Sequence, residues 1–146
     1  MEHHPLVGPV VALLAWTVVM FLWMYATRIP AMMAAGIDLK SRVGGQGKDL
    51  DAVLPAKIQW KSHNYNHLME QPTLFYAVCI ILILMNVDVP TATYAAWAYV
   101  GLRVLHSLVQ SLSNRILFRF GLFLLSSFAL IVLVATAAIA AFLQGY

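Results

Sequence analysis

The chain has 146 residues, of which 62% are hydrophobic and only 10% are charged, and its mean hydropathy is +0.80. Because an ordinary soluble domain carries about 25% charged residues, this composition excludes a soluble globular protein and indicates a membrane protein. A bilayer core of about 30 Å needs about 20 apolar residues per helix. We therefore expect residues 1–146 to form one all-α integral membrane domain with four transmembrane helices.

The formal net charge of +3 is less informative than the placement of the basic residues, which predicts how the chain is oriented in the membrane. By the positive-inside rule, segments rich in lysine and arginine face the cytoplasm. We therefore expect both termini and the turn at 86–90 to be non-cytoplasmic, and we expect no nucleic-acid partner. The basic residues fall between the first two apolar runs, or near the turn after the third: Arg28, Lys40, Arg42, Lys48, Lys57, Lys61, Arg103, Arg115 and Arg119.

Four helices are expected, at about 5–35, 56–86, 91–112 and 116–143, with a polar, glycine-containing cytoplasmic loop at 36–55. Pro5 suits a first helical turn, and Pro72 is expected to kink the second helix. The lone Cys79 lies in an apolar run and predicts no disulfide.

The second helix begins with a polar stretch that leads directly into an apolar one. Gln59, His63, Asn66 and Glu70 recur at spacings of 4, 3 and 4, which places them on one helical face. Ionisable groups at membrane depth are costly and indicate a functional site. We therefore expect the chemistry on this face.

The third helix carries a matching polar stripe. Because a short turn joins it to the second helix, the two are expected to be antiparallel, with Glu70 and Arg103 at similar depth and able to pair. The excess of donors and cations favours a pocket for an anionic ligand. Two other hypotheses remain open: a network that only joins helices, and a metal site, although neither H-E-x-x-H nor paired E-x-x-H motifs occur. The further residues of the stripe are Arg103, His106, Ser107, Gln110 and Asn114.

These motifs resemble the MAPEG family, the membrane-associated proteins of eicosanoid and glutathione metabolism. The pattern Asn66-x-x-x-Glu70-x-Pro72-x-x-Phe75 is followed by Arg103-x-x-His106-Ser107 and by Asn114-Arg115. A second alignment, anchored on Glu70, places His67 at the position of the family's Asn and His63 at that of its basic residue. The resemblance covers essentially the whole chain.

The resemblance implies a homotrimer that binds glutathione, as a thiol co-substrate, between neighbouring subunits near the cytoplasmic side. The implied activity is a transferase or peroxidase acting on lipophilic electrophiles or hydroperoxides, with membrane lipids as surroundings. The alternative is a non-catalytic trimeric ligand-binding or scaffold protein with a polar intersubunit cleft. Arg115 is the candidate for stabilising the thiolate, since a nearby guanidinium lowers the pKa of a thiol from about 8.5. The other candidates, for binding the co-substrate, are Arg28, Gln59, His63, Asn66, His67, Glu70, Arg103, His106 and Gln110.

Overall fold

The computed structural model describes residues 3–38 and 43–143, and over these residues the secondary structure is helical. Lys40 and Arg42 of the predicted basic loop lie outside the described residues, as do 1–2 and 144–146 at the termini. The all-α prediction is confirmed. The elements in chain order are α1 (Val7–Ala34), the short 3-10 helix η1 (Gly47–Leu50), α2 (Ala56–Met69), α3 (Pro72–Leu84), α4 (Pro90–Leu112) and α5 (Ile116–Leu143).

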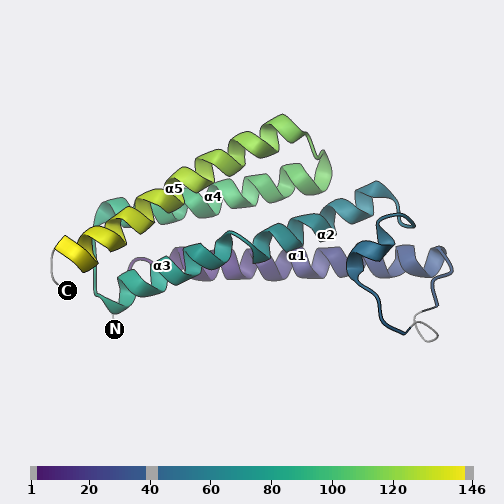
Figure 1. Cartoon of the computed structure of the whole chain (residues 1–146), viewed down its shortest axis with the longest axis horizontal. Coiled ribbons are helices and arrows are strands. Elements are labelled where there is room, and N and C mark those ends of the chain that lie inside the picture. Colours follow the sequence, from purple (N-terminus) through teal and green to yellow (C-terminus); the bar gives the residue numbers. More distant parts are fainter. Residues whose placement is uncertain (1–2, 39–42, 144–146) are drawn as a thin grey trace.

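The helices form two hairpin-like pairs that run side by side (Figure 1). α1 lies along α2 and α3, while α4 lies along α5 with the most extensive helix contact in the molecule. α1 begins and α5 ends at the same end of the bundle (Figure 1). The connecting segment, which we define as 43–55, packs at the other end beside the start of α2.

The core between α1, α3, α4 and α5 is built mainly of apolar side chains, although polar side chains such as Arg103 and Gln110 are buried as well. Leu13, Met20 and Leu82 are fully buried. Phe75 stacks on Tyr99 with ring centroids 4.6 Å apart and planes 10° apart, an offset aromatic contact that adds to the area both rings bury. Ala96 on α4 is fully buried, and its small side chain permits close approach of the neighbouring helices.

Three helical stretches among the described residues are long and apolar enough to cross a membrane: Val7–Ala34, Ala56–Leu84 and Ile116–Leu143. Their outward surfaces are apolar, as Leu22 and Phe128 illustrate with exposed fractions of 60% and 68%. Such surfaces suit contact with lipid or with other membrane helices. α4 carries more polar residues than Val7–Ala34 or Ile116–Leu143, and most of those side chains are buried.

The second predicted helix is interrupted where Pro72 was expected to kink it. α2 ends at Met69, Glu70 adopts φ −92° and ψ −97°, and Pro72 begins α3. Proline has no N–H to donate to the preceding turn, and its ring clashes with the carbonyl four residues earlier. The Glu70 carbonyl accepts the backbone N–H of Thr73 at 3.2 Å and also the Thr73 hydroxyl at 2.6 Å. The break therefore leaves backbone carbonyls near 67–70 available to side chains.

Candidate functional site

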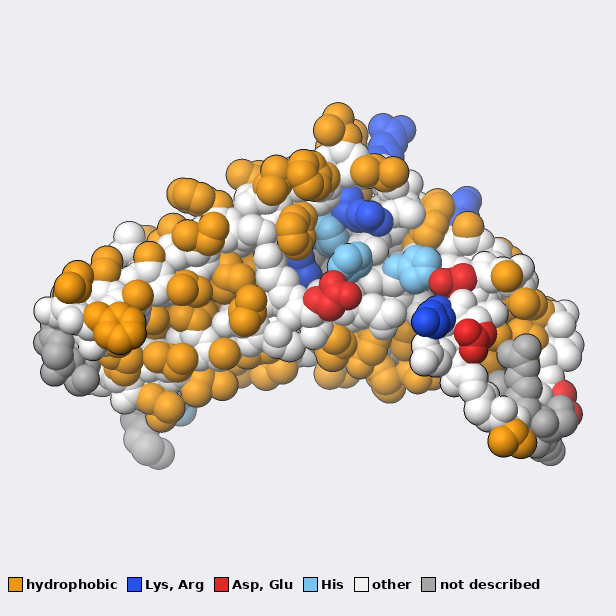
Figure 2. Space-filling view, viewed as in Figure 1, with side chains coloured by type: hydrophobic (Ala, Val, Ile, Leu, Met, Phe, Trp, Pro, Cys, Tyr) orange, Lys and Arg blue, Asp and Glu red, His pale blue; other side chains and the backbone are white. Residues whose placement is uncertain are grey.

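Charged and histidine side chains gather on one face of the molecule, over its middle and the end that carries the connecting segment (Figure 2). Two pockets lie among them. The loop pocket has a volume of about 380 Å³ and the histidine pocket one of about 190 Å³. The loop pocket is lined by Met24, Tyr25, Arg28, Gln46, Gly47, Lys48, Asp51, Ser62, His63, Tyr65 and Asn66. The histidine pocket is lined by His67, His106, Ile116, Arg119, Phe120 and Phe123.

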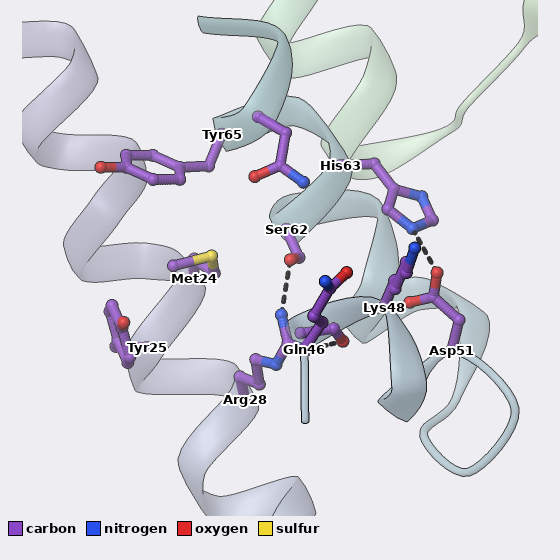
Figure 3. A pocket seen from close by; sticks show the side chains of 11 residues that line it. Met24, Tyr25, Arg28, Gln46, Lys48, Asp51, Ser62, His63 and Tyr65 are labelled. Atoms are coloured by element: carbon purple, nitrogen blue, oxygen red, sulfur yellow. Dashed lines mark hydrogen bonds and ion pairs between the residues drawn. The ribbon is translucent and has the colours of Figure 1, made fainter. Parts of the chain in front are cut away.

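The loop pocket is enclosed by α1, the connecting segment and α2 (Figure 3). Met24 and Arg28 lie one turn apart on α1, and Ser62 and Asn66 lie one turn apart on α2, so each helix presents one face to the cavity. Asn66 is exposed at the rim. The cavity thus has a polar lining of amide, hydroxyl and charged groups that suits a polar ligand.

Arg28 anchors the connecting segment. It is only 7% exposed, and its guanidinium donates through Nη1 to Ser62 Oγ on α2 and through Nη2 to the Gly47 carbonyl on the segment. A Cβ at Gly47 would lie 3.4 Å from Arg28 Nη2, about the distance of an ordinary van der Waals contact, so the backbone of the segment passes close to the guanidinium. The predicted binding residue therefore lies at the pocket, with two of its donors already engaged by the protein.

Two further contacts fix the same segment. Gln59 is 3% exposed, and its Nε2 donates to the Leu50 carbonyl at 2.6 Å. His63 Nε2 lies 3.2 Å from Asp51 Oδ2, with both side chains largely exposed. His63 lines the loop pocket as predicted for a site residue, whereas Gln59 is directed into the protein and lines neither pocket.

The histidine pocket is formed where α2, α4 and α5 meet. The rings of His67 and His106 lie edge to face, with centroids 6.2 Å apart. His106 is 4% exposed, and its Nδ1 has no hydrogen-bond partner within the described chain. Over residues 3–38 and 43–143, no group of three or more His, Cys, Asp and Glu side chains is placed to hold a metal ion. The phenyl rings of Phe120 and Phe123 complete an apolar wall.

Arg103 lies beneath the helix break and does not form the expected ion pair with Glu70 in this chain. Its Nη2 donates to the His67 carbonyl at 2.9 Å, while Glu70 Oε2 lies 3.0 Å from His67 Nδ1. The break explains the difference, because it leaves the His67 carbonyl with only a long backbone hydrogen bond, from the Glu70 N–H at 3.4 Å, and leaves the Glu70 side chain at the surface. Arg103 is 1% exposed, and its Nε and Nη1 have no partner among the described residues. Arg103 thus binds the backbone of His67, whereas Glu70 contacts its imidazole ring.

Arg119 was not among the predicted site residues, yet it lines the histidine pocket. Its Nη1 donates at 2.7 Å to Oδ1 of Asn114, which adopts φ 48° in the α4–α5 turn. Asparagine tolerates this left-handed conformation better than most residues. Arg115, the predicted catalytic residue, is exposed just before α5 and lines neither pocket in the single chain. Arg115 precedes the first residue of α5, whereas Arg119 lies in its first turn, on the side that faces the histidine pocket.

The structure divides the predicted site residues into groups. Arg28, His63 and Asn66 line the loop pocket, and His67 and His106 line the histidine pocket. Gln110 is 1% exposed and, like Gln59, lines neither pocket. The remaining lining residues of the two pockets were not predicted, because nothing local in the sequence indicates where the connecting segment folds back or which face of α5 turns inward. The lining residues with polar or aromatic side chains that were not predicted are Tyr25, Gln46, Lys48, Asp51, Ser62, Tyr65, Arg119, Phe120 and Phe123.

Comparison with known proteins gives one match. No curated protein matches the chain, and no solved structure does. The family model described as the MAPEG family matches residues 6–139, which is nearly the whole chain and includes both pockets. The polar side chains around the two pockets and the apolar outer surfaces described above also fall within that match. This chain therefore belongs to the MAPEG family.

Proposed function

We propose that this protein is a membrane-bound glutathione-dependent transferase or peroxidase that acts on lipophilic electrophiles or hydroperoxides. The observation that carries the proposal is the histidine pocket, where the Arg119 guanidinium and two imidazoles meet the phenyl rings of α5. A cation beside an apolar wall suits a thiolate that must meet a lipophilic partner. Membership of the MAPEG family, which includes such enzymes as well as non-catalytic members, supports it.

The residues at the two pockets fit a thiol tripeptide. The loop pocket offers amide, hydroxyl and cationic groups for the polar ends of such a ligand, with Asn66 and His63 at its rim. In the histidine pocket, His106 Nδ1 and two nitrogens of nearby Arg103 have no partner in the described part of the chain. When bound, glutathione supplies the thiol that acts as nucleophile. The protein's task is to hold the sulfur as the anion and to exclude water.

Two arginines are candidates for stabilising the thiolate. Arg115 is the candidate that the family resemblance supplies, and Arg119 is supported by its position in the histidine pocket and by its hydrogen bond to Asn114. A fixed guanidinium stabilises a developing or resting anion more strongly than a mobile one, because its orientation costs no further reorganisation. We therefore assign the larger role to Arg119.

We further propose a homotrimer of four-span subunits, with α4 as the fourth span and both termini on the non-cytoplasmic side. Asn66, Glu70 and Arg115 are exposed in the single chain. A neighbouring subunit packed on this face would cover them and close the pockets. α4 is long enough for a span at 23 residues, and packing of its polar face against α2 and α5 would keep that face from lipid.

The test is a titration of the purified protein in lipid nanodiscs with glutathione, following the ultraviolet absorbance of the thiolate. We expect saturable binding with a thiolate signal at neutral pH, followed by product when a lipophilic electrophile or hydroperoxide is added. Absence of both binding and thiolate would contradict the proposal. Binding and thiolate without turnover of any such substrate would favour a non-catalytic ligand-binding member of the family.

A further inference from the structure

The loop pocket contains two basic side chains that differ in what they are free to do. Arg28 is almost buried, and its two terminal nitrogens donate to Ser62 Oγ and to the Gly47 carbonyl. A guanidinium held in this way fixes the connecting segment against α2. Two of its five N–H donors are engaged by the protein and the side chain is only 7% exposed, so little of the guanidinium is accessible to a ligand.

Lys48 differs from Arg28 in both its exposure and its contacts. It belongs to η1, its side chain is exposed, and it lines the loop pocket. Its ammonium group makes no hydrogen bond or ion pair with any of the residues the structure describes. The nearby Asp51 carboxylate is taken by His63 at 3.2 Å. Figure 3 shows Lys48 projecting from the connecting segment towards α2, beside this pair.

The segment that carries Lys48 is held in place at several points. Besides the Arg28 contact to Gly47, Gln59 donates to the Leu50 carbonyl, and Asp49 Oδ2 accepts the backbone N–H of Gln46 at 2.6 Å. Backbone on both sides of Lys48 is therefore tied to α1, to α2 or to its own turn. A lysine on such a base loses less freedom on binding than one on an untethered loop.

We infer that Lys48 is a ligand-binding residue of the loop pocket and that its ammonium group binds a carboxylate of a polar anionic ligand. Arg28, in contrast, positions the connecting segment and not the ligand. The pocket volume of about 380 Å³ lies in the range of small-molecule sites. Gln46, Ser62 and Asn66 supply further polar groups around the cavity. The inference rests on the proposed function, in which the carboxylate belongs to glutathione.

The experiment uses the full chain in nanodiscs and calorimetric titration with two probes, glutathione and its diethyl ester, in which both carboxylates are blocked. The variants are Lys48→Ala, Lys48→Arg and the control Lys57→Ala, which removes an exposed lysine that does not line the pocket. We expect Lys48→Ala to weaken glutathione binding about 10-fold, as for loss of a charge-assisted hydrogen bond. Lys48→Arg is expected to retain most of the glutathione affinity of the unmodified protein, and Lys57→Ala is expected to leave that affinity unchanged.

For the diester, Lys48→Ala and the unmodified protein are expected to bind equally, because the carboxylate partner is gone. Equal glutathione affinity for these two proteins would overturn the inference while leaving the proposed function intact. An equal loss for acid and ester would also overturn it, since the lysine would then act on the shape of the pocket and not on a carboxylate. If the unmodified protein binds no glutathione, the proposed function and this inference both fail.

Discussion

The loop pocket and the histidine pocket both take a wall from α2, but they are built in different ways. The loop pocket depends on side chains that reach across to backbone carbonyls, as Arg28 and Gln59 do. The histidine pocket depends on packing of α2, α4 and α5, which brings two imidazoles and a guanidinium against phenyl rings. We propose that the two pockets divide the work, with recognition of polar groups at the loop pocket and chemistry at the histidine pocket.

The largest expected effect tests the chemical role of the histidine pocket. Arg119→Ala is expected to lower kcat/KM about 100-fold or more, because it removes a fixed cation from the pocket where we propose that the thiolate is stabilised. Arg115→Ala is the matched variant, four residues earlier and exposed, and we expect a loss of only a few fold. Steady-state kinetics with glutathione and a lipophilic electrophile measure both. Equal losses, or a larger loss at Arg115, would reverse the assignment.

The next prediction tests the recognition role of the loop pocket. Arg28→Ala leaves Ser62 Oγ and the Gly47 carbonyl without their donor and should cost about 1–3 kcal/mol of stability. The connecting segment then loosens, so KM for glutathione should rise about 10-fold while kcat changes little. Thermal unfolding in detergent and steady-state kinetics give the two readouts. A fall in kcat with KM unchanged would show that the two pockets do not divide the work in this way.

A smaller effect tests how the helix break is coupled to α5. Gln71 Nε2 donates to Ser127 Oγ at 2.8 Å, and Ser127 in turn donates to the carbonyl of Phe123, which lines the histidine pocket. A double-mutant cycle with Gln71→Leu and Ser127→Ala should give a coupling energy of about 0.6 kcal/mol, the average for interhelical hydrogen bonds in membranes, and not more than about 1.7 kcal/mol. Additive effects in thermal unfolding would mean that this contact does not hold α5 to the break.

The smallest effect concerns the orientation of Arg119. Asn114→Gly keeps a residue that accepts φ 48° but removes the Oδ1 acceptor of the 2.7 Å hydrogen bond. We expect kcat to fall about three-fold, with stability nearly unchanged, because the arginine remains but is less well oriented. Kinetics and thermal unfolding of the same preparation check this. An unchanged kcat would show that the hydrogen bond does not orient the guanidinium in the working enzyme.

Sequence reasoning identified the family and the all-α membrane class, and it identified Pro72 as the point of a kink, because composition, apolar run length and proline chemistry act locally. It also selected His67 and His106, which meet in one pocket. It was wrong about a direct Glu70–Arg103 pair within the chain. Helical spacing assumed one continuous face, and the break at Glu70 rotates that face and offers a backbone carbonyl to Arg103 instead.

The sequence by itself determined that this chain is helical, lies in a membrane and carries polar groups on its second and third predicted helices, because those properties follow from residue type and spacing. Only the tertiary structure decided that Gln59 and Gln110 are buried, that Arg119 lines the histidine pocket and that Lys48 lines the loop pocket, its ammonium group unpaired among the residues the structure describes. The physical reason is that these placements depend on how helices rotate against one another and on where the connecting segment folds back. Both are set by contacts between residues far apart in the chain.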